Sequence, residues 1–83
     1  MTTLEERFHK ATEDAMQIGV SPETAVLLKS YALYKQATVG DVRGERPTDT
    51  VGAAKYDAWE QVVGMGTKEA MERYIALIEA QKG

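Results

Sequence analysis

Two lysines of the sequence stand beside aromatic residues and away from acidic ones, which makes them candidates for binding an anion. Most basic residues in helical stretches have an acid three or four positions away, whereas Lys35 and Lys55 have none. Tyr31 lies four positions before Lys35 and therefore shares its helix face, and Tyr34 is adjacent. An ammonium group beside phenol hydroxyls suits a phosphate, which takes both a positive charge and hydrogen-bond donors.

The same spacing has a purely structural explanation. A lysine stem often covers a tyrosine ring one helical turn away, with a weak cation–π contact. Lys29 and Arg7 also lack acids at helical spacing, so a missing partner is not sufficient. Phe8, Trp59 and Tyr74 likewise fit a hydrophobic core as well as a ligand site. Spacing alone therefore indicates an anion-binding helical bundle and goes no further.

The composition gives little support to catalysis or metal binding. The 83 residues include no cysteine and one histidine, His9, which excludes thiolate zinc sites, cysteine nucleophiles and two-histidine metal sites. Carboxylates stand mostly beside bases on polar helix faces, as in Glu6 with Lys10 and Glu69 with Arg73. We expect a protein that is not an enzyme and that holds neither a cofactor nor a metal.

Charge and hydropathy narrow the class of partner. Thirteen acids against ten bases give a net charge of −3, which argues against general nucleic-acid binding. The first residues lack the basic and apolar segments of a secretory signal. No apolar run approaches the ~18 residues that a membrane span requires. We therefore expect a cytoplasmic protein without stable membrane insertion.

Glycine and proline divide the sequence into four helical segments. The expected helices cover residues 4–18, 23–39 and 52–63, with a fourth that follows Thr67 as its cap. Thr3 and Glu6 form a capping box for the first helix. Gly19 ends that helix, and Ser21 with Pro22 starts the second. No alternation of period two competes with the helical spacing, so the fold class is all-α.

A long loop separates the second helix from the third. Residues 40–49 contain two glycines, a proline and five charges, so no helix is expected there. This connection is longer than those usual between the helices of a bundle. Such a loop can run the length of a bundle, which permits the two helices that it joins to lie parallel.

Three motifs resemble, in their order and spacing, the acyl-CoA-binding protein family. They are YKQATVGD at residues 34–41, ERP at residues 45–47 and KYDAW at residues 55–59. The resemblance implies a four-helix bundle of up-down-down-up topology, with the long loop between the second and third helices. It also implies a single acyl-CoA-binding domain over residues 1–83. Such a protein binds, buffers and transports medium- to long-chain fatty acyl-CoA esters without enzymatic activity, and we expect a monomer because a carrier gains nothing evident from dimerisation.

The resemblance also implies roles for nine residues. Tyr31 and Lys35 match the family residues that hold the 3′-phosphate of CoA, and Lys55 matches a lysine that contacts the CoA head group. The other implied ligand-binding residues are Tyr34 and Tyr74 around the adenine part, and Phe8, Thr12, Leu27 and Leu28 along the acyl groove.

The sequence departs from the family pattern at several positions. Tyr56 stands where the family usually has tryptophan, and Met16 and Ser21 stand where it has lysines. Val51 and Ala53 replace further lysines near the end of the long loop. These losses keep open a second function, a helical bundle for protein interaction whose affinity for acyl-CoA is weakened or lost.

Overall fold

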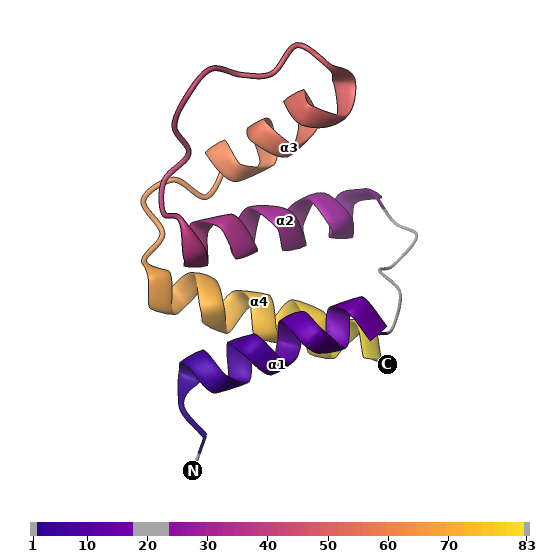
Figure 1. The fold of residues 1–83 in the computed structure, drawn as a ribbon, viewed down its shortest axis with the longest axis vertical. Coiled ribbons are helices and arrows are strands. Elements are labelled where there is room, and N and C mark those ends of the chain that lie inside the picture. Colours follow the sequence, from indigo (N-terminus) through magenta and orange to yellow (C-terminus); the bar gives the residue numbers. More distant parts are fainter. Residues whose placement is uncertain (1, 18–23, 83) are drawn as a thin grey trace.

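The computed structural model describes residues 2–17 and 24–82, and four helices make up most of them. They are α1 (Leu4–Gln17), α2 (Thr24–Thr38), α3 (Thr50–Glu60) and α4 (Thr67–Lys82). Helices α1 and α4 run in one direction and α2 and α3 in the other, which is the expected up-down-down-up topology (Figure 1). The two described ranges contain no strand, and the all-α class is confirmed. The predicted helix end at Gly19 and helix start at Ser21 and Pro22 lie outside the described residues.

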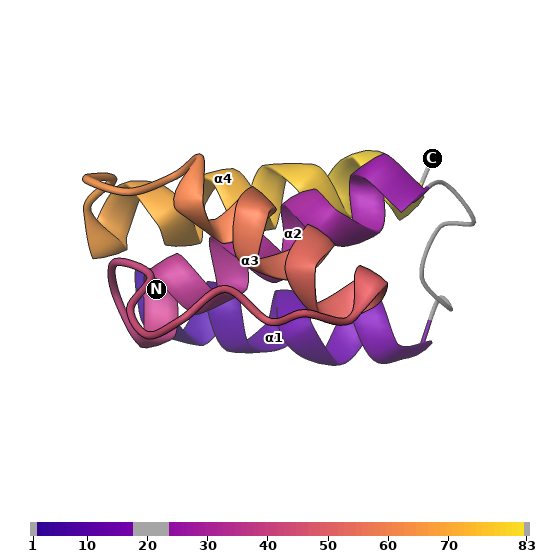
Figure 2. The same ribbon diagram turned by 90° about the horizontal axis from the view of Figure 1, so that it is seen from above.

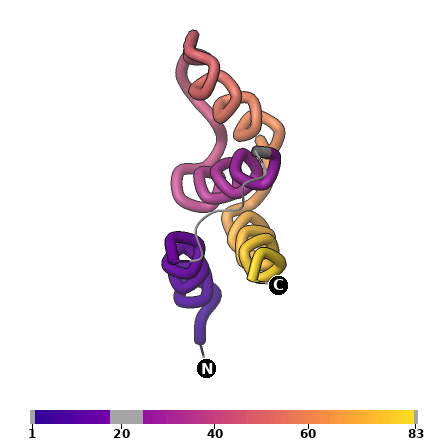
Figure 3. The backbone as a smooth tube through the Cα atoms, turned by 90° about the vertical axis from the view of Figure 1, so that its right-hand side faces the viewer, coloured from indigo at the N-terminus to yellow at the C-terminus, as the bar shows by residue number. Residues whose placement is uncertain are grey.

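Helices α2 and α4 form the centre of the bundle. Helix α1 packs against α4 and helix α3 packs against α2, so the helices follow one another across the bundle in the order α1, α4, α2, α3 (Figure 3). The core lies between α1, α2 and α4; its buried members are Phe8, Ala11, Leu33, Ala37, Ala70, Tyr74, Ile75 and Ile78. Helix α3 contributes only Ala53 to the buried residues described. Its position therefore depends on α2 and on the loop that precedes it.

The first helix begins as the sequence predicts. The hydroxyl oxygen of Thr3 accepts the backbone N–H of Glu6 at 3.1 Å, and the Glu6 carboxylate accepts the backbone N–H of Thr3 at 3.2 Å. These reciprocal bonds satisfy two backbone donors that the first helical turn leaves without partners. The predicted capping box is confirmed.

The third helix is displaced toward the N-terminus from the range predicted for it. It begins at Thr50 because the Asp49 carboxylate caps it, accepting the backbone N–H of Gly52 at 2.7 Å. It ends at Glu60, after which residues 61–64 form turns that close at Gly64, with φ of +90°. The helix was predicted at about residues 52–63 and lies earlier at both ends. Its start differs because Asp49 was counted as a loop charge, and its end differs because residues 61–64 form turns.

The fourth helix begins at Thr67 itself, whereas a helix capped by Thr67 would begin at the next residue. Thr67 is its first helical residue, and the backbone N–H of Ala70 donates to the carbonyl of Gly66 at 2.9 Å. The prediction of Thr67 as the cap was wrong, because the glycine before it supplies the first carbonyl of the helix.

Residues 39–49 pass along the outer side of α3 (Figures 1 and 2). Three side chains of α3 bind them there. The contacts are Trp59 Nε1–H to the Gly40 carbonyl at 2.8 Å, Tyr56 O–H to the Gly44 carbonyl at 3.0 Å, and two 2.8 Å bonds from the Arg46 guanidinium to the Asp57 carboxylate. The Arg46 charge lowers the pKa of Asp57, mainly through the hydrogen bond. The loop thereby fixes α3 parallel to α2.

A buried glutamine joins the end of α2 to the turn before α4. Gln36 is 2% exposed, and its amide nitrogen donates to the Asp41 carboxylate at 2.7 Å and to the Met65 carbonyl at 2.9 Å. Asp41 also accepts the backbone N–H of Gly64 at 2.8 Å, and this bond is the main reason that its pKa is lowered. Gln36 and Asp41, both within YKQATVGD, therefore hold together the end of the bundle where the long loop begins.

Candidate functional site

The parallel packing of α2 and α3 brings two ammonium groups to one phenol ring. Lys55 Nζ lies 5.2 Å from the centroid of the Tyr31 ring, and Lys35 Nζ lies 5.8 Å from the same centroid. Lys35 Nζ is also 5.7 Å from the centroid of the Trp59 ring. Among the ion pairs of the described ranges, none includes either lysine. Two positive charges thus stand beside one ring, and no carboxylate of the described residues forms an ion pair with either.

These groups border a groove of about 690 Å³ between α2, α3 and α4, a volume in the range of small-molecule sites. Its lining residues are Leu27, Leu28, Ser30, Tyr31, Tyr34, Lys35, Val51, Lys55 and Tyr74. Seven of these nine are among the residues that the sequence singled out. The groove therefore combines aliphatic and aromatic walls with two cations.

Two predicted site residues, Phe8 and Thr12, do not line this groove. Phe8 is 7% exposed and packs edge to face against Tyr74, with ring centroids 5.1 Å apart, and its centroid is 6.0 Å from that of Tyr34. Phe8 thus packs against the two tyrosines that line the groove. The Thr12 hydroxyl donates to the His9 carbonyl at 2.6 Å, within its own helix.

The deepest aromatic residue of the groove is Tyr74. It is 6% exposed, and burial together with the nearby Tyr34 phenol raises its pKa above the ordinary value of 10.0. Its hydroxyl is protonated at neutral pH, as that of an ordinary tyrosine is, and can donate a hydrogen bond. Tyr34 lies at the rim with 41% of its surface exposed, which leaves part of its ring open to a ligand.

Two lining residues, Ser30 and Val51, were not assigned to the site from the sequence. Val51 stands four positions before Lys55 and so shares its helix face, which is a signal that spacing could have supplied. Ser30 carries no such signal, and its hydroxyl donates to the Leu27 carbonyl at 2.9 Å within α2. Ser30 lines the groove with a small, uncharged side chain.

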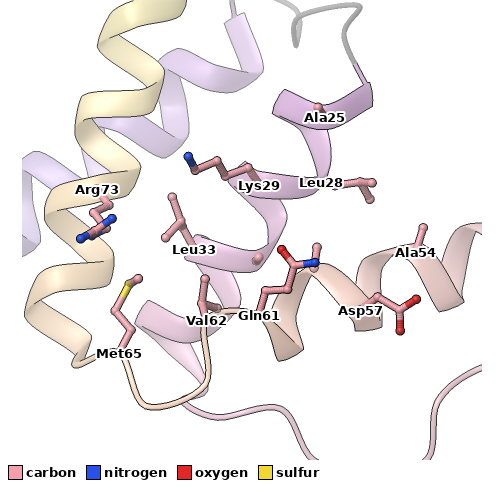
Figure 4. Close-up of a pocket in the computed structure, with 12 residues that line it drawn as sticks. Ala25, Leu28, Lys29, Leu33, Ala54, Asp57, Gln61, Val62, Met65 and Arg73 are labelled. Atoms are coloured by element: carbon pink, nitrogen blue, oxygen red, sulfur yellow. The ribbon is translucent and has the colours of Figure 1, made fainter.

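A second cavity of about 680 Å³ lies on another side of α2 (Figure 4). Its lining does not combine unpaired cations with aromatic rings as the first groove does. Two of its charged residues are already paired, Arg73 with Glu69 at 2.8 Å and Asp57 with Arg46 at 2.8 Å. Lys29 is its one other cation, and no aromatic side chain lines it. The groove beside Tyr31 is therefore the better candidate for an anionic ligand.

Of the two ion pairs that the sequence predicts between neighbouring helical turns, one is formed. The predicted pair of Glu69 and Arg73 is formed. Lys10 instead lies 3.4 Å from Asp14, because the Glu6 carboxylate is used in the capping box. The parts of the chain that the structure describes hold no cluster of three or more side chains able to bind a metal. No helix within them is long and apolar enough to cross a membrane.

Fold and groove together define a class: a helical-bundle binding protein for a ligand that is anionic at one part and apolar at another. The chain belongs to the acyl-CoA-binding protein family, since the family model described as "Acyl CoA binding protein" matches residues 5–78. This confirms the resemblance seen in the motifs. The family consists of binding proteins that need no cofactor, so the expectation that the chain is not an enzyme is confirmed as well.

Relatives and solved structures agree with this assignment. The chain is 42% identical over 78 residues to "Acyl-CoA-binding protein" of Brassica napus, with 92% of this chain and 85% of the relative covered. It is 39% identical over 74 residues to "Acyl-CoA-binding protein homolog 1" of Caenorhabditis elegans, with 87% and 86% covered. The crystal structure of Oryza sativa Acyl-CoA-Binding Protein 2 is similar with a TM-score of 0.88 at 36% identity, over 94% of this chain and 89% of that one.

Proposed function

We propose that the protein binds, buffers and transports fatty acyl-CoA esters, with the 3′-phosphate at Tyr31, Lys35 and Lys55 and the acyl chain in the groove beside them. One observation carries this proposal: two ammonium groups lie within 5.8 Å of one phenol ring at the edge of a groove with apolar walls. A phosphate accepts bonds from both kinds of donor. No described carboxylate competes for the two lysines in an ion pair.

The two parts of the ligand contribute different things to binding. Each methylene that leaves water contributes about 0.8 kcal/mol, so the acyl chain supplies much of the affinity before ordering costs. Each hydrogen bond to a charged group contributes about 1.5–3 kcal/mol, so the phosphate supplies selectivity. A free fatty acid lacks the phosphate and free CoA lacks the chain. Of the three molecules, only the ester has both a phosphate for the two lysines and an apolar chain for the walls of the groove.

The aromatic residues support a place for the adenine part of CoA. Tyr34 is 41% exposed at the rim, and stacking of a base on an aromatic ring is worth about 1–3 kcal/mol. The Tyr74 ring lies next to it, with centroids 6.2 Å apart, and offers a hydroxyl that can donate a hydrogen bond. Contacts of Phe8 and Thr12 with the acyl chain stay predictions from the family resemblance; both residues lie on α1, which packs against α4.

We also propose that residues 1–83 act as a single acyl-CoA-binding domain, as a monomer, in the cytoplasm and without affinity for nucleic acid. The net charge of −3 supports the last point, because it disfavours association with phosphate backbones. Sedimentation of the protein alone and with acyl-CoA tests the monomer, and fractionation of cells tests the location.

Isothermal titration with hexadecanoyl-CoA, kept below its micelle concentration, tests the proposal. Free CoA and hexadecanoate serve as controls. We expect saturable one-to-one binding of the ester, with much weaker binding of either control. A folded sample that takes up no ester would contradict the proposal and favour the protein-interaction function. Release of free thiol on prolonged incubation would contradict the absence of enzymatic activity.

A further inference from the structure

The second cavity, of about 680 Å³, lies where no residue of α1 covers the other helices. The described residues that line it belong to α2, α3, the segment that follows α3, and α4. Helix α1 packs against α4, and its Phe8 ring lies beside the tyrosines of the first groove instead. A further helix could therefore lie along this cavity without displacing any described part of the fold.

The floor of this cavity is apolar and open in part to water. Ala32 and Leu33 are each 1% exposed and form its most buried part. Leu28, Val62 and Met65 also line it and are only half-buried. In a helical bundle a neighbouring helix covers side chains of this kind, because the free energy gained grows with the apolar area removed from water. The cavity thus has the shape and the lining that receive an amphipathic helix.

Two cations border the cavity between α2 and α4. Lys29 is exposed, forms no ion pair within the described ranges and extends from α2 toward α4, which carries Arg73 (Figure 4). Among the described hydrogen bonds, Arg73 uses only Nε, to Glu69, so its other N–H groups can still donate. Asp57 lies across the cavity on α3, and its carboxylate already accepts two bonds from Arg46. This rim therefore attracts a carboxylate, although the whole chain has a net charge of −3.

The cavity is separate from the groove that contains the two lysines of the candidate site. Of the described lining residues, only Leu28 is common to both. On α3, Lys55 borders the groove, whereas Ala54 and Ala58 border the cavity. Occupation of the cavity therefore leaves the groove open to its own ligand.

We infer that this cavity is a docking site for an acidic amphipathic helix of a partner protein, which binds whether or not the groove holds acyl-CoA. The aliphatic face of that helix covers Leu28, Val62 and Met65, and a carboxylate beside that face meets Lys29 and Arg73. The partner can then stay bound while acyl-CoA enters or leaves the groove. Docking itself does not depend on the proposed function.

A second copy of this chain does not offer the matching surface. Acidic residues are present on α1 and α4, as at Glu5 and Glu69. The apolar residues of these two helices are buried in their own core, among them Phe8 on α1 and Tyr74 on α4. An exposed helix with both an acidic and an aliphatic surface therefore comes from a different protein.

Selection from a phage-displayed library of amphipathic helical peptides against the wild-type protein tests this inference. We expect enrichment of helices that carry leucine-type side chains on one face and aspartate or glutamate beside it. The most enriched peptide is then synthesised with a fluorescent label and titrated with the protein. A saturating amount of hexadecanoyl-CoA should change the affinity of this peptide by less than about twofold, because the two sites are separate.

Three variants locate the peptide on the surface, and circular dichroism checks that each is folded. Lys29→Glu should weaken the peptide about five- to tenfold, since an attractive charge pair becomes a repulsive one. Ala58→Gln puts a longer side chain into the cavity and should weaken the peptide about fivefold or more. Lys68→Glu is the matched control, because Lys68 is exposed on α4 and lines neither cavity nor groove. It should bind the peptide within about twofold of wild type.

Several outcomes would overturn the inference. They are enrichment of no helix or of basic helices, equal affinity of the peptide for wild type, Lys29→Glu and Ala58→Gln, and an equal loss in Lys68→Glu. Displacement of the peptide by hexadecanoyl-CoA would place it in the groove and would overturn the inference as well. A wild-type dimer in sedimentation that Ala58→Gln converts to a monomer would make a second copy the occupant, again against the inference. Failure of wild type to bind hexadecanoyl-CoA would overturn only the proposed function, since the peptide is titrated without the ester.

Discussion

Replacing Lys35 by alanine tests the phosphate site most directly. Lys35 lies between the rings of Tyr31 and Trp59, at 5.8 and 5.7 Å from their centroids, and makes no ion pair in the described part of the chain. The residue as a whole is half-buried, so part of its side chain is shielded from water. Loss of one charged hydrogen-bond partner costs about 1.5–3 kcal/mol, or roughly ten- to a hundredfold in affinity.

The control for this change lies on the same helix. Lys29 also lacks an ion pair within the described ranges but lines the second cavity, so Lys29→Ala removes the same charge from α2 without touching the groove. We expect Lys29→Ala to bind hexadecanoyl-CoA within about twofold of wild type, since surface charges act weakly at a distance in salt. Circular dichroism of both variants checks that they are folded.

The ligand can be changed in the same way as the protein. Titration with hexadecanoyl-3′-dephospho-CoA removes the phosphate that Lys35 is proposed to hold. Wild type should bind this ester more weakly than the complete one. The difference between the two esters should be smaller in Lys35→Ala, because that variant keeps only the contacts of Tyr31 and Lys55 with the phosphate. If Lys35→Ala weakened both esters by the same factor, Lys35 would not contact the 3′-phosphate. If it bound the complete ester as tightly as wild type, the phosphate assignment would be refuted.

Three further changes probe the surroundings of this site. Tyr31→Phe removes one hydroxyl and should weaken acyl-CoA binding by less than Lys35→Ala does, by about 0.5–1.5 kcal/mol; unchanged affinity in titration would show that the hydroxyl does not touch the ligand. Trp59→Phe keeps a ring beside Lys35 but leaves the Gly40 carbonyl without its donor. The free energy of unfolding, measured in urea by circular dichroism, should therefore fall by about 1–3 kcal/mol. Equal stability would contradict a structural role for that bond. The Arg46 hydrogen bond lowers the pKa of Asp57 below its ordinary value of 3.8. The bond therefore stabilises the fold fully above pH 3.8, and this stabilisation is lost as the pH falls through the lowered pKa. The melting temperature should fall in this acid range, less steeply in Asp57→Asn, and an identical slope in that variant would refute the assignment.

Much of the local structure follows from the sequence because its causes are local. The capping box of Thr3 and Glu6 depends on groups three residues apart, and it forms as predicted. The spacing of Tyr31 and Lys35 places them on one face of a helix whatever that helix packs against. The motifs around them identify the family, and with it the topology of the bundle.

The arrangement between helices was decided by tertiary structure. The sequence singles out Lys55, but only the parallel packing of α3 on α2 brings its ammonium group within 5.2 Å of the Tyr31 ring. That packing depends on the loop contacts of Trp59 and Arg46, which join residues far apart in the chain. The packing of Phe8 against Tyr74 likewise depends on how α1 meets α4, and its predicted contact with an acyl chain stays a prediction.

The residue types and spacings of this protein therefore determined which side chains could bind a phosphate and an apolar chain. Its tertiary structure decided which of them meet in one groove. The physical reason is that helical periodicity is set by bonds within a few residues, whereas the approach of Lys55 to the Tyr31 ring depends on where two whole helices pack against each other.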